Sequence, residues 1–478
     1  MGIRTGSEYR ERLRDGRSIY VNGERVKDVT TYPPFKRTVQ TVAALYDLQH
    51  NAANLPLLTY PSPKSGEPVS LSFLRVENVE DVTRVMRAEE LRAEATFGLM
   101  GRMPDFMNAL VTDAAVAAPY LGRREPRFGE NVVRYYEDCR EQDLCLTHTL
   151  VDPQIDRSKG PAEQVDPEAA LHFVRETDRG IVVRGARMLS TLAPFADEIW
   201  VGPFYPRKPG EERYALCFAI PIDTEGLKFI CREPYDTGRS AFDRPVSSRF
   251  DEEDALAVFD DVLVPWERVF INGDIEASNS FLVHGAGHSV LQGAIRGIVK
   301  LRFMTGLACR VAEAIGRASA PHVQAQLGEL VAKVELGNGL LQAAALEVAA
   351  ASGKGGSLRT LAATVWVFIP EAQMRVAEVI RQLSGSGLIL TPTEKDFGNP
   401  EIAHYLEKYL QGSNLSAQRR VQLFKLAWDM LGEQFGSRQL HYEWFYAGDP
   451  MFTRARFYNS PAVNTYKAMV DRLLNTPV

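Results

Sequence analysis

Four long stretches rich in Ala, Leu, Val and Glu constrain the fold of this chain more than any other feature. They lie in its second half and cover residues 289–316, 321–351, 358–384 and 416–435. Helices of this composition can share one apolar seam, so the sequence predicts an up-and-down four-helix bundle. Gly385 and Gly387 should end the third helix, and a short helix is expected near Tyr405.

The rest of the chain shows other sequence patterns. Residues 7–136 read mainly as helix, because residues 79–94 are charged and periodic and an apolar segment near residues 110–118 can pack against them. Short β-branched or aromatic runs broken by Gly and Pro then indicate strands, at residues 180–185, 198–202, 215–220 and 255–265. We expect these strands to close into a small sheet or barrel, with residues 255–265 as its last strand.

The predicted fold is therefore mainly α with a β domain. An N-terminal helical domain (1–145) is followed by a middle β-barrel domain (146–272) and by a C-terminal four-helix bundle with a tail (273–478).

Composition excludes several classes of function. The 478 residues, 45% of them hydrophobic, can bury a large core. The net charge of -6, with no basic stripe, argues against a nucleic-acid partner. Five cysteines form no CxxC pair, which argues against a disulfide framework and against zinc. No apolar run reaches roughly 18 residues and the first residues are charged, so we expect no membrane span, no signal peptide and a cytoplasmic protein.

Common cofactor and catalytic fingerprints are missing. The sequence has no GxGxxG after a strand, no Walker loop, no GxSxG elbow and no HExxH. The segment Gly353-Lys354-Gly355-Gly356 reads as a loop between two helices rather than as a phosphate loop. The sequence therefore gives no support for a dinucleotide-binding site, a phosphate-binding loop, a serine hydrolase or a zinc protease.

Three distant motifs suggest a site assembled from different parts of the chain. They are Gly101-Arg102-Met103-Pro104-Asp105-Phe106, Thr147-His148-Thr149-Leu150-Val151-Asp152-Pro153 and Phe445-Tyr446-Ala447-Gly448-Asp449-Pro450. Each of the first two places a cation or a titratable ring beside residues that bend the backbone. Arg102 and His148 are therefore candidates for chemistry, although an arginine that braces a turn and a solvated or capping histidine are the ordinary alternatives.

A polar series marks the first bundle helix. His288, Gln292, Arg296, Lys300 and Met304 recur every four residues and so share one face. If buried, that face needs partners or a ligand, because an unpaired buried charge is costly. The alternative is that this helix face is exposed to solvent or lies in a contact between subunits. His284 lies four residues before His288, but no third ligand is evident, so we predict no metal site.

Taken together, these motifs resemble one enzyme family. The matching segments are Gly101 to Asp105, Thr147-His148 to Asp156-Arg157, Ala186 to Pro194, Phe259 to Val269, Asn399 to Ile402 and Tyr446 to Pro450. With the order of helical, strand-rich and bundle segments, they are similar to the large oxygenase component of the 4-hydroxyphenylacetate 3-monooxygenases, an oxygen-using branch of the acyl-CoA dehydrogenase superfold. The resemblance covers nearly the whole chain.

The resemblance implies a function. Members of that family take reduced FAD from a separate flavin reductase, form a C4a-hydroperoxide with O2 and hydroxylate a phenol ortho to its hydroxyl group. It implies that Arg102 donates to the developing phenolate oxygen, and that His148 hydrogen-bonds that oxygen or the hydroperoxide. A homotetramer is also implied.

The resemblance also implies a set of binding residues. For the substrate these are Arg102, Phe106, His148 and His288, with Phe204 and Tyr205 on a lid formed by residues 202–207. Phe106 stands where the family commonly has tyrosine, which puts 4-hydroxyphenylacetate itself in doubt, and residues 121–126 look inserted. Arg207 or Lys208 could meet a substrate carboxylate. For FAD the residues are Gln154, Ile155, Asp156, Arg157, Thr191, Gln382, Tyr446, Ala447, Gly448 and Asp449.

Alternatives come from different reaction classes. A halophenol or nitrophenol monooxygenase of the same family would use His284 or His288 as a base. A 4-hydroxybutyryl-CoA dehydratase would need three cysteines and a histidine around an iron-sulfur cluster, and Met103 and Phe106 do not provide them. Acyl-CoA dehydrogenation would need a bundle carboxylate, and a non-enzymatic scaffold would not need Arg102 and His148.

Overall fold

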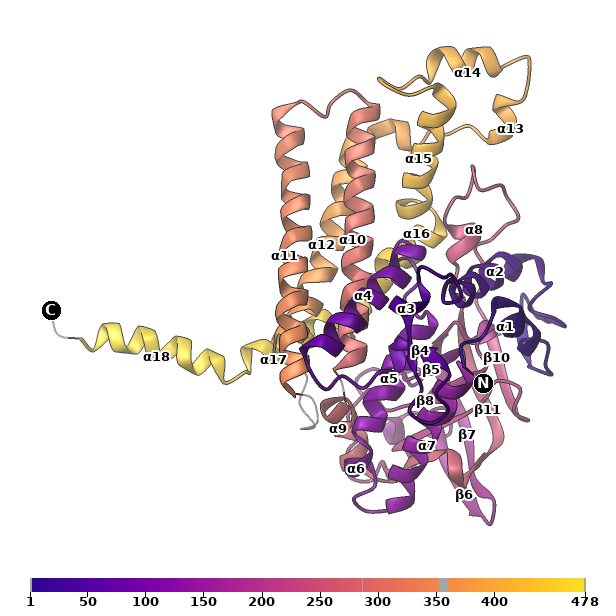
Figure 1. Ribbon diagram of the computed structural model, residues 1–478, viewed down its shortest axis with the longest axis vertical. Coiled ribbons are helices and arrows are strands. Elements are labelled where there is room, and N and C mark those ends of the chain that lie inside the picture. Colours follow the sequence, from indigo (N-terminus) through magenta and orange to yellow (C-terminus); the bar gives the residue numbers. More distant parts are fainter. Residues whose placement is uncertain (1, 286, 352–359, 477–478) are drawn as a thin grey trace.

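Helices dominate the first part of the chain in the computed structural model, which describes residues 2–285, 287–351 and 360–476 (Figure 1). The helices there are α1 (Gly6–Arg12), α2 (Pro33–Leu48), α3 (Leu55–Leu58), α4 (Val79–Ala95), α5 (Pro104–Val116), α6 (Ala118–Leu121) and α7 (Pro126–Gln142). Short strands interrupt them, namely β1 (Ile19–Val21), β2 (Glu24–Arg25), β3 (Thr59–Pro61) and β4 (Pro68–Ser70). The sequence patterns did not reveal these strands, each of which is three residues or shorter.

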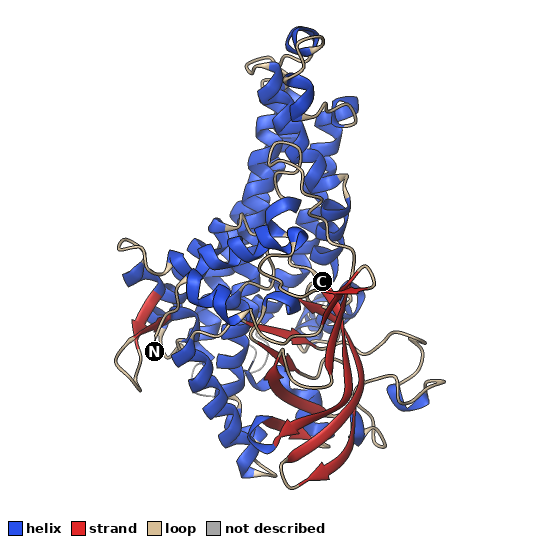
Figure 2. Ribbon diagram, turned by 90° about the vertical axis from the view of Figure 1, so that its right-hand side faces the viewer, coloured by secondary structure: helices blue, strands red, loops and turns tan. Residues whose placement is uncertain are grey.

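The middle of the chain forms two open sheets. One sheet has the order β2-β1-β10-β11-β7-β6 and the other the order β12-β9-β8-β5. Their strands are β5 (Leu146–Thr149), β6 (His172–Thr177), β7 (Gly180–Thr191), β8 (Glu198–Val201), β9 (Leu216–Pro221), β10 (Leu227–Cys231), β11 (Asp254–Pro265) and β12 (Val269–Asn272). Figure 2 shows these strands gathered at one end of the molecule, below the long helices.

The prediction of a barrel was therefore wrong for the residues that the structure describes. The six-stranded sheet ends at β2 and β6 and the four-stranded sheet at β12 and β5, so neither closes on itself. The sheets instead bury apolar side chains in one shared core, which includes Ile181, Phe218 and Phe259. The strand at residues 255–265 is present as β11, but β12 follows it and is the last strand.

The N-terminal segment takes part in the larger sheet. β1 pairs in parallel with β10, with Ile19 opposite Phe229, although more than 200 residues separate them. Ile19 and Val21 are buried while Tyr20 between them is only partly so, which is the alternation of a strand with one buried face.

The predicted bundle helices are present with adjusted ends. α10 (His288–Ala314), α11 (Pro321–Ala351) and α12 (Thr360–Ser384) pack along one another, and α15 (Ala417–Leu431) packs against α10 and α12. The fourth helix ends at Leu431 rather than at residue 435, because Gly432 caps it with an N–H bond to Trp428. The start expected at residue 358 and the loop Gly353-Lys354-Gly355-Gly356 lie outside the described residues.

Shorter helices complete the chain. They are α8 (Ser247–Phe250), α9 (Ile275–Gly285), α13 (Glu394–Phe397), α14 (Ala403–Tyr409), α16 (Gln434–Phe445), α17 (Pro450–Tyr458) and α18 (Ala462–Leu474). α14 contains Tyr405, as predicted, and α12 ends directly before Gly385. α18 extends away from the rest of the molecule (Figure 1).

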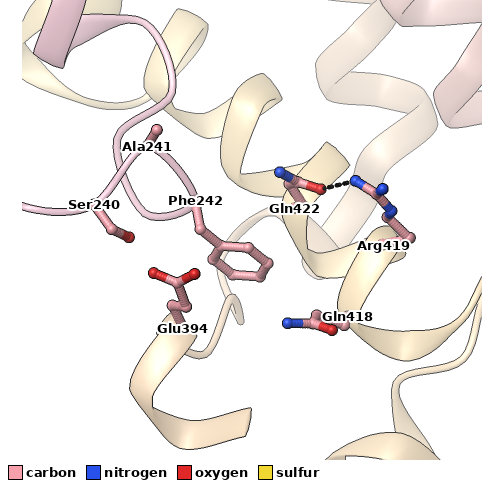
Figure 3. A pocket seen from close by; sticks show the side chains of 7 residues that line it. All are labelled: Ser240, Ala241, Phe242, Glu394, Gln418, Arg419 and Gln422. Atoms are coloured by element: carbon pink, nitrogen blue, oxygen red, sulfur yellow. Dashed lines mark hydrogen bonds between the residues drawn. The ribbon is translucent and has the colours of Figure 1, made fainter. Parts of the chain in front are cut away.

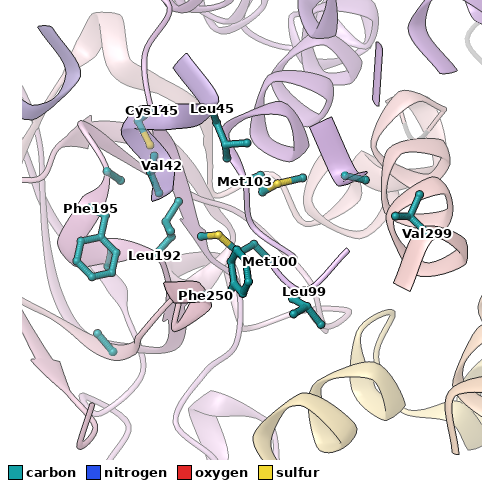
Figure 4. Packing of buried hydrophobic residues seen from close by; sticks show 14 of the residues in the cluster. Val42, Leu45, Leu99, Met100, Met103, Cys145, Leu192, Phe195, Phe250 and Val299 are labelled. Carbon is teal, nitrogen blue, oxygen red and sulfur yellow. The ribbon is translucent and has the colours of Figure 1, made fainter. Parts of the chain in front are cut away.

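One core joins the segment of the first motif to the sheets and the bundle. Figure 4 shows Met100 and Met103 beside side chains from the sheet region and the bundle. Met100 and Met103 are completely buried, as is Leu192 at the end of β7, and Val299 of α10 belongs to the same cluster. Arg102 therefore lies in the sequence between two buried methionines.

None of the helices in the described residues is both long and apolar enough to cross a membrane.

Candidate active site

Arg102 and His148 meet in the interior of the molecule. Arg102 lies just before α5, and His148 lies in β5, where it pairs with Trp200 of the parallel strand β8. The Nε of Arg102 donates a hydrogen bond to Nε2 of His148 over 2.7 Å. The two residues are only 8% and 7% exposed. Residues from two separate motifs therefore form one buried polar pair.

The contact fixes the protonation of His148. A guanidinium nitrogen can only donate, so Nε2 of His148 must accept and the ring proton must sit on Nδ1. Burial, together with the charge of Arg102, lowers the pKa of His148 well below its usual value. Its Nδ1 is buried and has no hydrogen-bond partner among the described residues. His148 is therefore a neutral imidazole with one N–H free to bind something else.

Aromatic rings surround the Arg102 guanidinium. Its central carbon lies 4.2 Å from the ring centroid of Phe106, 4.4 Å from that of Tyr446 and 5.5 Å from that of Tyr442. Burial disfavours the charge of Arg102, but the two tyrosines and Glu252 outweigh this effect, so its pKa is raised. Ring faces stabilise a nearby cation and keep water away from it.

Gly101 is required by the close approach of α16. A Cβ at this position would lie 2.2 Å from the hydroxyl oxygen of Tyr442, closer than any real contact. The hydroxyl of Tyr442 is buried and has no hydrogen-bond partner among the described residues. The hydroxyl of Tyr446 donates to the Gly101 carbonyl over 3.5 Å. The end of α16 is therefore packed directly on the turn that carries Arg102.

The predicted lid residues lie between two predicted flavin segments. Tyr205 is close enough to Arg157, Asp449 and Gln154 for each to influence its pKa, which burial raises overall. The Nη2 of Arg157 donates to the side chain of Gln154. Tyr205 therefore lies near residues of both segments, 154–157 and 446–449.

The remaining residues of these segments are more exposed. Ile155 is 56% exposed, the Asp156 carboxylate accepts from the Ser158 hydroxyl over 2.7 Å, and Ala447 is exposed.

A Cβ at Gly448 would lie 3.1 Å from the ring of Phe204, so the turn and the lid touch. Tyr446 itself stacks on Trp366 of α12 with 4.7 Å between ring centroids.

Thr191 lies beside β5 at the end of β7. Its hydroxyl donates to Asp254 over 2.7 Å, and its carbonyl accepts from the Thr147 hydroxyl. Leu189 and Leu192, on either side of it, have φ angles of 60° and 73°. Leucine rarely adopts this backbone conformation, and such strain concentrates at functional sites.

The polar face of α10 is buried and finds partners within the protein. Gln292 donates to Asp105 over 2.7 Å. Arg296 binds Glu443 of α16, to which Lys300 also donates over 2.9 Å. Although burial opposes it, the charges of Arg296 and Lys300 lower the pKa of Glu443 to about 2. The face therefore joins α10 to the tail.

His288 is engaged at both ring nitrogens. Its Nδ1 contacts the Asp113 carboxylate at 2.7 Å, and its Nε2 accepts from the Val76 backbone N–H over 3.2 Å. Asp113 also accepts from the backbone of His288 and from Ser289, so this cluster caps the start of α10. In this structure His288 holds helix ends together and presents no free nitrogen to a substrate. His284 stacks on Tyr120 at 3.7 Å, and the described residues contain no cluster of three potential metal ligands.

Gln382 is not brought to the other predicted flavin residues. It lies sixteen residues beyond Trp366 in α12, which is about 24 Å along a helix. Its side chain accepts from Gln326 over 3.0 Å and is exposed.

Tyr442 and Glu252 contact Arg102 but were not among the predicted site residues. The Arg102 backbone N–H donates to Glu252 over 2.5 Å. Tyr442 had a detectable signal, because it lies four residues before Tyr446 and so shares its helix face. Glu252 had none, since only the folded chain places it beside residue 102.

A separate groove of about 490 Å³ lies between the segment before α8 and the helices α13 and α15. Figure 3 shows its lining, which includes Phe242, Glu394 and Arg419. None of the predicted site residues lines it.

Comparison with known proteins decides the family. The model for the N-terminal part of the 4-hydroxyphenylacetate 3-hydroxylases matches residues 5–271, and the model for the C-terminal part matches residues 281–475. The chain belongs to the 4-hydroxyphenylacetate 3-hydroxylase family. The predicted resemblance is thereby confirmed, and with it the class of enzyme, an FAD-dependent aromatic monooxygenase.

Curated relatives match over the full length. The oxygenase component of 4-hydroxyphenylacetate 3-monooxygenase from Thermus thermophilus is 42% identical, covering 98% of this chain and 97% of the relative. The component of the same name from Geobacillus sp. (strain PA-9) is 39% identical, covering 99% and 97%. A crystal structure of such a component with FAD and 4-hydroxyphenylacetate has a TM-score of 0.93 at 41% identity, covering 98% of both chains.

The alternatives are less well supported. A 4-nitrophenol 2-monooxygenase oxygenase component from Rhodococcus is 35% identical over 93% of this chain and 86% of its own. An archaeal 4-hydroxybutyryl-CoA dehydratase has a TM-score of 0.89 at 22% identity, covering 100% of this chain and 96% of its own, which shows a shared fold only. A glutaryl-CoA dehydrogenase, at a TM-score of 0.51 and 14% identity, covering 94% and 92%, extends that fold to the acyl-CoA dehydrogenases.

Proposed function

We propose that this family member hydroxylates a phenol ortho to its hydroxyl group, and that the phenol oxygen binds between Arg102 and His148. The observation that carries the proposal is the buried pair itself, in which His148 keeps one unused N–H. A neutral donor beside a fixed cation suits an oxygen that gains negative charge.

The two side chains would act on the phenol directly. A phenol has a pKa of roughly 10, and its ring becomes richer in electrons as the oxygen approaches phenolate. Arg102 would stabilise that charge, and the Nδ1–H of His148 would hold the oxygen in place. Phe106, whose ring lies 5.7 Å from that of His148, would contact the aromatic ring without a further hydrogen bond.

The residues of this chain fit FAD, which would supply the activated oxygen when bound. Segment 154–157 offers hydrogen-bonding side chains and the exposed apolar Ile155, and it meets the turn at residues 446–449 across Tyr205. Thr191 stands between two strained leucines next to β5. Burial of Arg102 and His148 keeps water from the reacting atoms.

Turnover with chemically reduced FAD tests the proposal. Reduced FAD, O2 and a panel of phenols are mixed with the protein, and hydroxylated product and hydrogen peroxide are measured. We expect ortho-hydroxylated product from at least one phenol. Hydrogen peroxide alone with every phenol would contradict the proposal.

Variants assign the roles. Arg102→Lys keeps the charge but loses the Nε contact, and His148→Asn loses the imidazole; each should lower product formation by about 10²-fold and raise peroxide. His404→Asn is the control, because His404 is exposed and lies far in sequence from every candidate site residue. Unchanged product in both site variants would remove Arg102 and His148 from the mechanism.

Further features of the whole protein are proposed on the same basis. A separate flavin reductase would deliver reduced FAD by diffusion, as the name oxygenase component implies for the relatives. We also propose a homotetramer in which α18, none of whose residues is buried in one chain, packs on a second copy. The division into units at residues 145 and 272 and the cytoplasmic location stay predictions.

A further inference from the structure

Two buried carboxyl groups meet beside the turn that carries Arg102. Glu89 belongs to α4, and Asp105 lies in the first turn of α5, directly before Phe106. The side chains of Glu89 and Asp105 are within hydrogen-bonding reach of each other, and the two residues are only 1% and 2% exposed. Two ionised carboxylates in such a place repel each other strongly, because little water screens their charges.

Each carboxyl group of the pair has one oxygen without a partner. Oε2 of Glu89 and Oδ1 of Asp105 are buried and have no hydrogen-bond partner among the described residues. A carboxylate oxygen can only accept a hydrogen bond, so two ionised groups cannot satisfy each other. A single proton held between them turns the repulsion into a short, strong hydrogen bond.

The charges around the pair also leave room for one proton. Burial and the adjacent Asp105 raise the pKa of Glu89 well above its usual value, although Arg92 opposes this effect. Nη1 of Arg92 donates to Oε1 of Glu89 over 3.3 Å. Nη2 of Arg92 is used elsewhere, since it donates to the Ser70 hydroxyl over 2.8 Å. One guanidinium group therefore stands against two carboxyl groups.

The other elements that pack against α4 direct their charged groups elsewhere. From α10, Arg302 pairs with the exposed Glu90 of α4, and His288 is held by a carboxylate of α5. From α11, Glu329 pairs with an arginine of α12. α3 and the short 3-10 helix η1 (Leu71–Phe73) contain no ionisable side chain. The charge that acts on Glu89 therefore comes from the pair itself and from its own helix.

Neutral side chains tie the pair to its surroundings. Nε2 of Gln292, on α10, donates to Asp105 over 2.7 Å. Nδ2 of Asn108, one turn further along α5, donates to the Ser72 hydroxyl over 2.9 Å. The Ser72 hydroxyl lies 2.9 Å from that of Ser70, which Arg92 binds. The acid pair is thus part of a buried polar network that joins α4, α5 and α10.

The network fixes the segment that carries the site. Asp105 is the third residue after Arg102 and precedes Phe106, whose ring centroid lies 4.2 Å from the guanidinium carbon of Arg102. The first turn of a helix favours a negative charge, so Asp105 is the better site for the charge and Glu89 for the proton. Any displacement of Asp105 moves Arg102 and Phe106 with it, because the three residues belong to one short segment.

We propose that Glu89 and Asp105 share one proton, and that this hydrogen-bonded acid pair holds Arg102 and Phe106 in position for the phenol. The inference rests on the proposed function and adds Glu89 and Asp105 to it as positioning residues, since they act through their neighbours. Loss of the proton in alkali leaves two adjacent buried carboxylates. Their repulsion separates α4 from the start of α5 and loosens the site.

Infrared spectroscopy of the whole protein tests the shared proton. A protonated carboxyl group has a C=O stretching band that a carboxylate lacks. We expect this band in the difference spectrum between the natural protein and Glu89→Gln at pH 7. Glu90→Gln is the matched control, because Glu90 is the next residue of α4 and its side chain is 43% exposed, and it should give no such band. A difference spectrum of Glu89→Gln without the band overturns the inference.

The pH dependence of the product yield tests the positioning role. The fraction of reduced FAD that yields hydroxylated 4-hydroxyphenylacetate rather than hydrogen peroxide is measured from pH 6 to pH 9, below the phenol pKa of roughly 10. Glu89→Gln donates to Asp105 at every pH, whereas Glu89→Ala has no donor. We expect Glu89→Ala to lose about tenfold in yield throughout, because a small misplacement of Arg102 is enough to uncouple the reaction.

The natural protein is compared with Glu89→Gln at each pH. Burial lowers the pKa of Lys300 to about 8, but Lys300 titrates in both proteins, so only the ratio of their yields counts. This ratio should fall at the pH at which the infrared band of the natural protein disappears. A ratio that stays constant while the band disappears, or that falls while the band persists, overturns the positioning role. So does a natural yield in Glu89→Ala.

A second variant guards against a failure to fold. If Glu89→Gln does not fold, Asp105→Asn takes its place in the infrared comparison. The amide of Asn donates to Glu89 and removes the neighbouring charge, so Glu89 ionises and the band is lost. A band that persists in Asp105→Asn overturns the shared proton.

A failure of the proposed function is recognised separately. If the natural protein hydroxylates no phenol, the infrared comparison still decides the shared proton. Calorimetric binding of 4-hydroxyphenylacetate then decides the positioning role. Binding about tenfold weaker in Glu89→Ala than in Glu89→Gln supports this role, and equal binding in the two variants overturns it.

Discussion

His148 shows at the scale of one residue how the fold sets a protonation state. Its pKa is lowered well below 6.5 in the folded protein, mainly by burial, whereas the unfolded chain binds a proton near pH 6.5. Below that pH the unfolded state therefore holds more protons, so acid favours unfolding. We predict that stability falls from pH 6.5 to pH 5.5, with His148 contributing at most about 1.4 kcal/mol per pH unit.

Urea unfolding at several pH values checks this prediction. His148→Asn should lose less stability than the natural protein over the same interval, because the variant has no such group to protonate. His404→Asn, at an exposed position, should follow the natural protein. Identical pH slopes in His148→Asn and the natural protein would show that His148 does not carry the effect.

Gly101 gives a second prediction at this scale. Its missing Cβ makes room for the Tyr442 hydroxyl, which would otherwise lie 2.2 Å away. We expect Gly101→Ala to cost about 1–3 kcal/mol in the free energy of unfolding and to lower hydroxylation. The double variant with Tyr442→Ala should regain part of the activity. Gly306→Ala in α10 is the matched control, because a Cβ there would meet no atom within 4 Å apart from its chain neighbours and the nearby backbone of its own helix.

At the scale of elements, one buried carboxylate joins α10 to α16. Glu443 holds Arg296 and Lys300, and all three are at most 2% exposed. Burial lowers the pKa of Lys300 to about 8, while Glu443 opposes that effect. Removing the carboxylate leaves two buried cations without a counter-charge, the situation in which a buried ion pair becomes most costly.

We therefore predict that Glu443→Gln lowers the free energy of unfolding by about 3–5 kcal/mol. Thermal and urea unfolding measure the loss. Glu371→Gln is the matched control, because Glu371 forms an exposed pair with Arg454 and should cost about 1 kcal/mol or less. A similar loss in both variants would mean that the buried cluster has no special role.

The same helix shows what the sequence could predict. The four-residue spacing from His288 to Lys300 correctly indicated one polar face that needs partners if buried. Periodicity is a local property, and so it could not identify Glu443 or Asp113, each more than 130 residues away. The resemblance predicted His288 as a substrate contact, and in the structure Asp113 and the Val76 backbone N–H occupy its two ring nitrogens.

At the scale of the whole molecule, contacts between residues far apart in the sequence determine the features that local sequence patterns could not predict. The strands β7, β8, β9 and β11 were predicted from β-branched runs. Whether they close into a barrel depends on which strands pair at the sheet edges, and a run of residues does not specify that pairing. β1 lengthens one sheet from a segment read as helical. Arg102 and His148 were found because their motifs bend the backbone, whereas Glu252 and Tyr442 are neighbours of Arg102 only in the fold.

The last prediction concerns assembly and starts from α18. Tyr466, Met469, Val470 and Leu473 follow the helical spacing of one apolar stripe, and each is more than half exposed. A helix of 13 residues is marginal alone in water, so this one needs a surface to cover its stripe. A second copy of the chain offers a surface that repeats by symmetry.

We predict that the double variant Met469→Glu with Leu473→Glu forms a smaller assembly than the natural protein, because two charges would have to be buried at the contact. Sedimentation velocity measures the mass of each assembly. Asn464→Glu with Lys467→Glu places two acids on the other face of α18 and should keep the natural mass. If both double variants keep that mass, α18 does not hold the copies together.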